Sequence, residues 1–240
     1  MKAEVPGPVF GKVVSKLKNT AQILYIIYLA LFALFAVLYY LAGMPLYDSL
    51  VIAMGTAGTG GFTVYNDGIA HYNSTLITYL VSFGVLTFGV NFNLYYYLLI
   101  RKFKTCFSDE ELRSYLWIVF VSTALIAFNI AHLYDGFAKS VEISFFQVSN
   151  IITTTGFGYG DTVEWPLFAQ VILLILMCLG GSAGSTAGGF KLIRGIIIAR
   201  IAKNQILSTL SSNRVLTMHV NGTVVDRKST RLNSSHLELS

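Results

Sequence analysis

The stretch "TTTGFGYGDT", Thr153 to Thr162, combines β-branched threonines with glycine at every second position from Gly156 to Gly160. A dehydrated monovalent cation needs a ring of oxygen atoms in place of its water, and backbone carbonyls supply that ring without charge. Glycine permits the dihedral angles that turn carbonyls inward, and threonine stiffens the neighbouring positions. The stretch therefore suits a carbonyl site for a cation, although glycine- and threonine-rich strings also form ordinary turns.

A second glycine-broken stretch precedes it in the chain. Aligning Gly61-Phe62 with Gly156-Phe157 places the two copies 95 residues apart (156 − 61 = 95). Each copy follows an apolar stretch of helical character, "SLVIAMGT" or "ISFFQVSNIITTT", inside an interval without charged residues, 49–66 or 143–160. A half-length helix followed by irregular backbone is tolerated at membrane depth only where protein covers it or where it lines a water-filled path. We therefore predict two re-entrant pore loops.

The elements that position these loops follow from composition. The chain is 54% hydrophobic and only 12% charged, which excludes a soluble globule and indicates a membrane protein. Four longer intervals contain no charged residue, and each is long enough for a helix of about 20 residues to cross a bilayer: 19–47, 68–100, 114–134 and 165–190. We therefore predict an all-α polytopic membrane protein of two repeats, each a helix, a re-entrant pore loop and a second helix. We expect no catalytic residues, no cofactor and no nucleic-acid partner.

Basic residues orient this arrangement, because cytoplasmic loops retain positive charge. They cluster before the first span, between the second and third, and after the fourth: Lys12, Lys16, Lys18, Arg101, Lys102, Lys104, Arg113, Lys191, Arg194, Arg200 and Lys203. The opposite side has Lys139 and a set of acids: Asp48, Asp67, Asp135, Glu142, Asp161 and Glu164. Both pore loops are thus predicted to enter from the outside, beneath an acidic vestibule that collects cations. We expect Lys191 and Arg194 to anchor the inner helix end at the lipid headgroups.

A third glycine-rich string, "GGSAGSTAGGFKLIR", interrupts the fourth span. A straight helix would not carry five glycines between positions 180 and 189, because each costs about 1 kcal/mol of helix propensity relative to alanine. We predict that the helix unwinds and that its small residues lie across the pore below the carbonyl site as a gate. The alternative is close helix packing through small residues.

Together these motifs resemble a known family. "TTTGFGYGDTVEWP" followed by "GGSAGSTAGGFKLIR" is similar to the third pore repeat of the Trk/Ktr/HKT superfamily of potassium transporters. "AEVPGP", "GTGGFTVYNDGIAHYNS", "NFNLYY" and "DEELRSYL" resemble the second repeat and its linker in the TrkH-type branch. The resemblance covers Ala3 to about Val225.

The resemblance implies that four such repeats in one chain surround a single pore in the bacterial inner membrane. It implies potassium as the transported ion, held at Gly61 and Gly156 in a filter to which we assign Thr59, Gly60, Gly61, Thr154, Thr155 and Gly156. It identifies the interrupted helix as an intramembrane gate of Gly180, Gly181, Ser182, Ala183, Gly184, Ser185, Thr186, Ala187, Gly188 and Gly189. It also implies a homodimer and a cytoplasmic nucleotide-binding regulatory subunit of the TrkA type.

The predicted organisation has five parts. Residues 1–20 form a cytoplasmic N-terminal segment, 21–104 the second-type repeat, 105–113 a cytoplasmic linker, and 114–225 the third-type repeat with the gate. The last part, 226–240, begins "DRKSTRLNSSH", which is the codon-by-codon translation of a common sequencing-adapter string. We expect it to be no part of the fold.

Two of the four repeats implied by the family are found in the sequence. We therefore expect a fragment of a potassium uptake protein. Two alternatives remain open: a two-repeat cation channel that completes its ring by dimerising, and a fragment that conducts nothing by itself.

Overall fold

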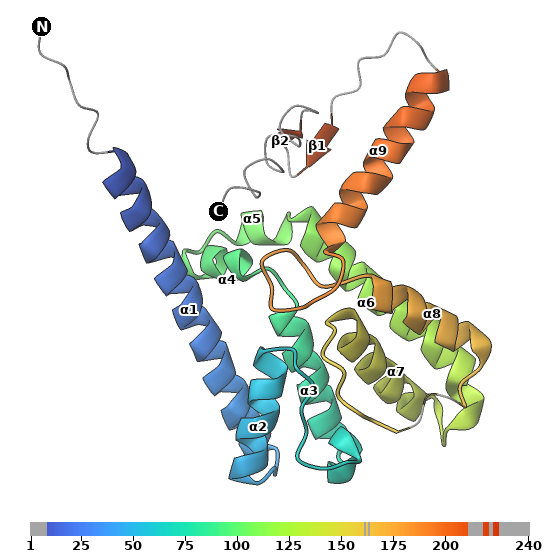
Figure 1. Cartoon of the computed structure of the whole chain (residues 1–240). Helices are drawn as coiled ribbons and strands as arrows, with labels where there is room; N and C mark the ends of the chain where they lie inside the picture. Colours follow the sequence, from blue (N-terminus) through green and yellow to red (C-terminus); the bar gives the residue numbers. More distant parts are fainter. Residues whose placement is uncertain (1–8, 161, 163, 211–217, 221–222, 226–240) are drawn as a thin grey trace, which may run out of the picture.

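The computed structural model describes residues 9–160, 162, 164–210, 218–220 and 223–225. It consists of helices in two groups that lie side by side (Figure 1). The predicted all-α fold is confirmed. One small addition was not predicted, an antiparallel hairpin of β1 (Met218–Val220) and β2 (Thr223–Val225). The predicted adapter segment 226–240 lies outside the described residues.

The first group contains α1 (Val9–Leu41), α2 (Leu46–Ala57), the 3-10 helix η1 (Gly68–Tyr72), α3 (Thr75–Phe88) and α4 (Phe92–Leu99). Its core lies where α1, α2 and α3 meet, and includes Phe35, Tyr39, Ile52, Val85 and Phe88. Helix α1 is continuous from Val9, so the described part of the predicted N-terminal segment belongs to this helix.

The second group contains α6 (Glu110–Ile130), η2 (Ala131–Leu133), α7 (Phe137–Ile152), α8 (Leu167–Cys178) and α9 (Leu192–Leu210). Its core includes Tyr115, Ile126, Ile130, Ile152 and Leu176. The short helix α5 (Phe103–Phe107) connects the groups, and α3 packs against α7 to join them. Each group therefore contains a series of three helices in the same order, α1, α2, α3 in the first and α6, α7, α8 in the second.

Side-chain caps fix where several helices begin. Ser74 accepts a hydrogen bond from the Ile77 backbone N–H at the start of α3, and Asp109 accepts one from Leu112 at the start of α6. Such caps satisfy backbone donors that have no partner within the helix. Glu110 and Glu111 follow Asp109 in the first turn of α6, where negative charge complements the helix dipole.

The four predicted spans differ in continuity. Within the described residues, Thr20–Leu41 of α1 and Glu110–Leu133 of α6 and η2 are long and apolar enough to cross a membrane unbroken. The second span is instead bent by 91° between α3 and α4, a break that we did not predict. The fourth ends after the 12 residues of α8, at the glycine-rich string where unwinding was predicted.

Candidate functional site

The two predicted pore loops follow α2 and α7, which have 12 and 16 residues. Most of α7 is buried, and so is the second half of α2. In α2, the N–H of Thr59 donates to Thr56 O (3.2 Å) and that of Gly60 to Gly55 O (2.7 Å). These two bonds are the closing bonds of the Schellman motif, which satisfies the last carbonyls of a helix.

Helix α7 ends in the same way. The N–H of Thr154 donates to Ile151 O (3.0 Å) and that of Thr155 to Asn150 O (2.9 Å). Thr59 and Thr154 both adopt left-handed conformations, with φ of +47° and +57°, and they lie 95 positions apart (154 − 59 = 95). Gly61 and Gly156 share that offset and also have positive φ, +67° and +78°. The backbone thus repeats with the spacing that the sequence alignment predicted.

The two loops lie against each other. A Cβ atom added to Gly61 would lie 2.1 Å from Thr155 O, and one added to Gly68 would lie 2.2 Å from Gly158 O. The Ile69 N–H donates to that same Gly158 carbonyl at 2.9 Å. Glycine is therefore required at Gly61 both for its positive φ and for the close approach of backbone.

The open side of the arrangement is at Gly156. Apart from Gly156 and its two chain neighbours, no atom of the described residues lies within 4 Å of a Cβ built on Gly156, although Gly61 is closely covered by the neighbouring loop. Gly60, Gly156 and Gly158 are all exposed. The two loops therefore line two sides of a space that this part of the chain does not close.

The threonine hydroxyls near the predicted filter form hydrogen bonds within the protein. The hydroxyls of Thr153 and Thr155 lie 2.7 Å apart, and that of Thr153 also donates to Ser149 O. An ion at this level would therefore meet backbone carbonyls. The hydroxyls of Thr59 and Thr154 instead reach the glycine-rich loop: Thr59 donates to Thr186 O (3.0 Å), and Thr154 accepts from the Gly188 N–H (2.7 Å).

That glycine-rich loop, residues 179–191, contains every predicted gate residue and is hereafter the gate loop. Its ends lie together, because the Gly180 N–H donates to Phe190 O at 2.8 Å. Figure 1 shows it between the two groups of helices, leading into α9. Since it contacts the threonines that follow α2 and α7, the gate loop lies at the base of both predicted pore loops.

The gate loop also explains the bend between α3 and α4. Carbonyls at the end of α3 accept from it, Phe88 O from the Thr186 N–H (3.3 Å) and Gly89 O from the Ser182 N–H (3.0 Å). At the start of α4, the Phe92 N–H donates to Gly184 O (3.0 Å). Backbone groups freed by the bend thus find partners in the gate loop, as buried backbone requires.

Glu111 is a site residue that the sequence reasoning missed. Its side chain is buried, and its Oε1 accepts from the backbone N–H groups of Ala183 (2.8 Å) and Ile193 (3.1 Å). The "DEELRSYL" motif was the available signal, but nothing in it shows which backbone it meets. Lys191, which we expected at the headgroups, turns its ammonium to Ala187 O within the gate loop.

The predicted acidic vestibule is only partly available to cations. Asp48 and Glu142 are both buried. Asp48 accepts from the Tyr72 hydroxyl at 2.8 Å. Glu142 pairs with Lys139 at 2.9 Å and also accepts from Thr75 Oγ1 at 3.0 Å. Asp67, Asp135 and Glu164 are exposed, whereas Asp161 lies outside the described residues.

The Lys139–Glu142 pair supports the second pore loop through Tyr159. The Tyr159 hydroxyl accepts from Lys139 Nζ (3.0 Å) and contacts Glu142 Oε1 (3.2 Å). Burial alone would raise the pKa of Glu142, but hydrogen bonds from Lys139 and Thr75 and the lysine charge outweigh it and lower that pKa. For Lys139, burial opposes the charged form, yet its bonds to Tyr159 and Glu142 raise its pKa.

Comparison with known proteins places this geometry in a family. Residues 4–232 match the TrkH family, described as cation transport protein. The Trk system potassium uptake protein TrkG of Escherichia coli (strain K12) is 32% identical over 227 residues, which cover 93% of this chain and 47% of that protein. TrkH of Salmonella typhimurium is 31% identical over 220 residues, 89% of this chain and 45% of that protein.

A solved structure shows the same arrangement. The crystal structure of the potassium transporter TrkH from Vibrio parahaemolyticus matches with a TM-score of 0.84 and 26% identity, over 93% of this chain and 49% of that one. The chain thus spans about half the length of the relatives that it matches. The family match also runs past Val225 to residue 232, into the segment that we assigned to an adapter. On the family match and these relatives together, the chain is a membrane protein and belongs to the TrkH family of cation transport proteins.

Proposed function

We propose that this chain forms two of the four walls of a potassium-conducting pore, as part of a multi-pass uptake protein of the bacterial inner membrane. The observation that carries the proposal is the repeated backbone at the ends of α2 and α7. Threonines in left-handed conformations and glycines with positive φ occur at the same positions of both loops, and the loops lie against each other. Equivalent loops around a common axis are what a carbonyl ring for an ion requires.

The relatives supply the choice of ion. TrkH of Salmonella typhimurium and TrkG of Escherichia coli are named potassium uptake proteins, and the filter predicted here is neutral and formed by backbone. The ends of α2 and α7 also direct their negative dipole ends towards the loops, which favours a cation there. We assign the ion to the carbonyls near Gly61 and Gly156, with Thr59, Gly60, Thr154 and Thr155 as their immediate neighbours.

The gate loop is proposed to control the path below this filter. It contacts Thr59 and Thr154 at the bases of both pore loops and continues directly into α9. A cytoplasmic nucleotide-binding subunit of the TrkA type that displaces α9 would therefore displace the gate loop. In the complete protein we propose that two such pores assemble as a homodimer.

The filter assignment is tested by substitutions in a full-length protein that carries this segment. Gly61→Ala and Gly156→Val should abolish the growth of an uptake-deficient bacterial strain on low potassium, because side chains there clash or disfavour positive φ. The matched controls are Gly58→Ala, where φ is −83° and the nearest contact is an ordinary 3.4 Å, and Phe168→Val on the exposed face of α8. Growth that is unchanged by Gly156→Val would contradict the assignment.

A second candidate function is a two-repeat channel completed by dimerisation. The uncovered side of Gly156 is compatible with it, because a second copy of the chain could close the space there. The chain covers only about half the length of its relatives, which favours two further repeats as the source of the other two walls.

We expect Met1 to Val225, expressed alone, to be unstable or non-conducting, because backbone on the open side would face lipid at several kcal/mol per unsatisfied group. Removal of 226–240 should change neither property. Selective potassium flux from a purified dimer of this chain would favour the second candidate.

A further inference from the structure

The side chain of Glu111, in the first turn of α6, is buried, which is unusual for a charged residue. It is 4% exposed, and one of its carboxylate oxygens accepts both of its recorded hydrogen bonds. The donors, Ala183 and Ile193, are ten positions apart (193 − 183 = 10) and lie in the gate loop and in the first turn of α9. A single oxygen atom therefore joins the gate loop to the start of α9.

The chemistry of these donors suits a carboxylate. Ile193 is the second residue of α9, so its N–H has no partner within that helix, and the helix dipole adds positive potential there. Glu111 thus caps α9 from a neighbouring helix. Hydrogen bonds to an ionised acceptor are about twice as strong as neutral ones.

Two threonines of the proposed filter hold the gate loop at other residues. Thr59 and Thr154 contact it at Thr186 and Gly188, whereas Glu111 contacts it at Ala183. Because α9 follows the gate loop directly, a movement of α9 away from α6 must separate Ile193 from Glu111.

From this geometry we infer that Glu111 is a positioning residue that latches the gate loop in place across the base of the filter. Glu111 affects the passage of the ion only through the position of the gate loop. The inference rests on the proposed gate and adds the group that keeps it closed.

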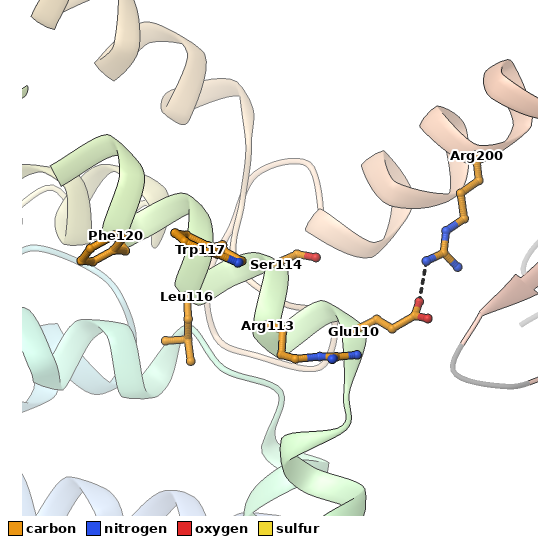
Figure 2. A pocket seen from close by; sticks show the side chains of 7 residues that line it. All are labelled: Glu110, Arg113, Ser114, Leu116, Trp117, Phe120 and Arg200. Carbon is orange, nitrogen blue, oxygen red and sulfur yellow. Dashed lines mark hydrogen bonds and ion pairs between the residues drawn. The ribbon is translucent and has the colours of Figure 1, made fainter. Parts of the chain in front are cut away.

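The preceding residue is a matched control. Glu110 has the same charge and sits in the same helical turn, but its carboxylate points to Arg200 of α9, at 2.8 Å (Figure 2). The side chains of Glu110 and Arg200 are 30% and 35% exposed. A partly exposed ion pair of this kind contributes little to stability. Glu110→Gln therefore removes one negative charge beside Glu111 and leaves the latch intact.

The test uses a full-length protein that carries this segment, reconstituted in liposomes at equal folded amounts. Rubidium flux and amide hydrogen exchange are measured for the wild type, Glu111→Ala, Glu111→Gln and Glu110→Gln. Glu111→Ala should raise flux roughly tenfold and speed the exchange of Ala183 and Ile193, because it removes two charge-assisted bonds. Glu111→Gln, which conserves size and one oxygen acceptor, should show a smaller increase in both and carries the test if the alanine variant fails to assemble. Glu110→Gln should match the wild type.

The outcomes distinguish a failure of the Glu111 latch from a failure of the proposed pore function. Exchange at Ala183 and Ile193 that stays at the wild-type rate in Glu111→Gln overturns the latch. Faster exchange with flux that is unchanged or reduced also overturns it, because Glu111 would then support the structure without closing the path. A wild type that carries no rubidium overturns the proposed function instead, and exchange alone then decides whether Glu111 holds the loop.

Discussion

At the scale of single residues, the two threonines that follow α2 and α7, Thr59 and Thr154, are the most informative. A β-branched residue in the left-handed region costs about 1–2 kcal/mol, and glycine is the usual choice at this position of a Schellman motif. Thr59 and Thr154 nevertheless occupy it in both repeats, with φ of +47° and +57°. Their hydroxyls reach Thr186 and Gly188, contacts that glycine could not make. The strain therefore accompanies a link between the proposed filter and the gate loop.

A prediction at this scale concerns the Lys139–Glu142 pair. Because the pKa of Glu142 is lowered in the folded protein, the stability that it contributes is present above its unfolded value and is lost as pH falls through the folded value. The thermal unfolding midpoint of the wild type should thus decrease below about pH 4.3, the ordinary glutamate pKa. The raised pKa of Lys139 acts in the opposite direction, so its contribution is lost only as pH rises above its ordinary value of about 10.4.

The pair can be tested against a matched substitution. Glu142→Gln should lower the unfolding midpoint at neutral pH and flatten the acid dependence, whereas Glu164→Gln, at an exposed position, should leave both as in the wild type. A pH profile of Glu142→Gln that superimposes on that of the wild type would show that the pair does not brace the second pore loop.

At the scale of elements, the gate loop and the bend between α3 and α4 form one structure. The bend exposes the carbonyls of Phe88 and Gly89, and the gate loop supplies their donors. Without the gate loop these carbonyls would lack their hydrogen-bond donors, and without the bend the Thr186 and Ser182 N–H groups of the gate loop would lack these acceptors. This interdependence is why the bend was missed from the sequence, since 68–100 reads as one uniform apolar interval. The break in the fourth span was predictable, because five glycines mark it.

Shortening the gate loop tests its role at this scale. Deletion of Gly184 to Thr186 removes the contacts of Thr186 with Thr59 and Phe88, and should raise rubidium flux in liposomes if the loop obstructs the path. If the small residues serve only for close helix packing, the same deletion should cause misassembly and lower flux per folded protein. Equal amounts of monodisperse protein make the two results distinguishable.

At the scale of the whole molecule, the sequence predicted the class, the duplicated order of helices and the register of the repeat, because these follow from charge-free intervals and a 95-residue offset. It did not predict that Glu111 meets Ala183 and Ile193, since that contact joins residues 72 and 82 positions apart and depends on how α6 and α9 pack. Nor did it predict that Asp48 and Glu142 are buried with partners. Local sequence patterns predicted the repeats, whereas these tertiary contacts and the burial of the two acids were visible only in the structure.

We propose that the loops containing Gly61 and Gly156 share one cation site. The most direct measurement is the anomalous difference density of rubidium in crystals of a full-length protein that carries this segment. We predict a peak in the space bordered by both loops, within carbonyl coordination distance of the backbone near Gly61 and near Gly156, and its loss in Gly156→Val. Well-ordered pore loops without a peak there, or a peak near only one of the two glycines, would contradict the claim.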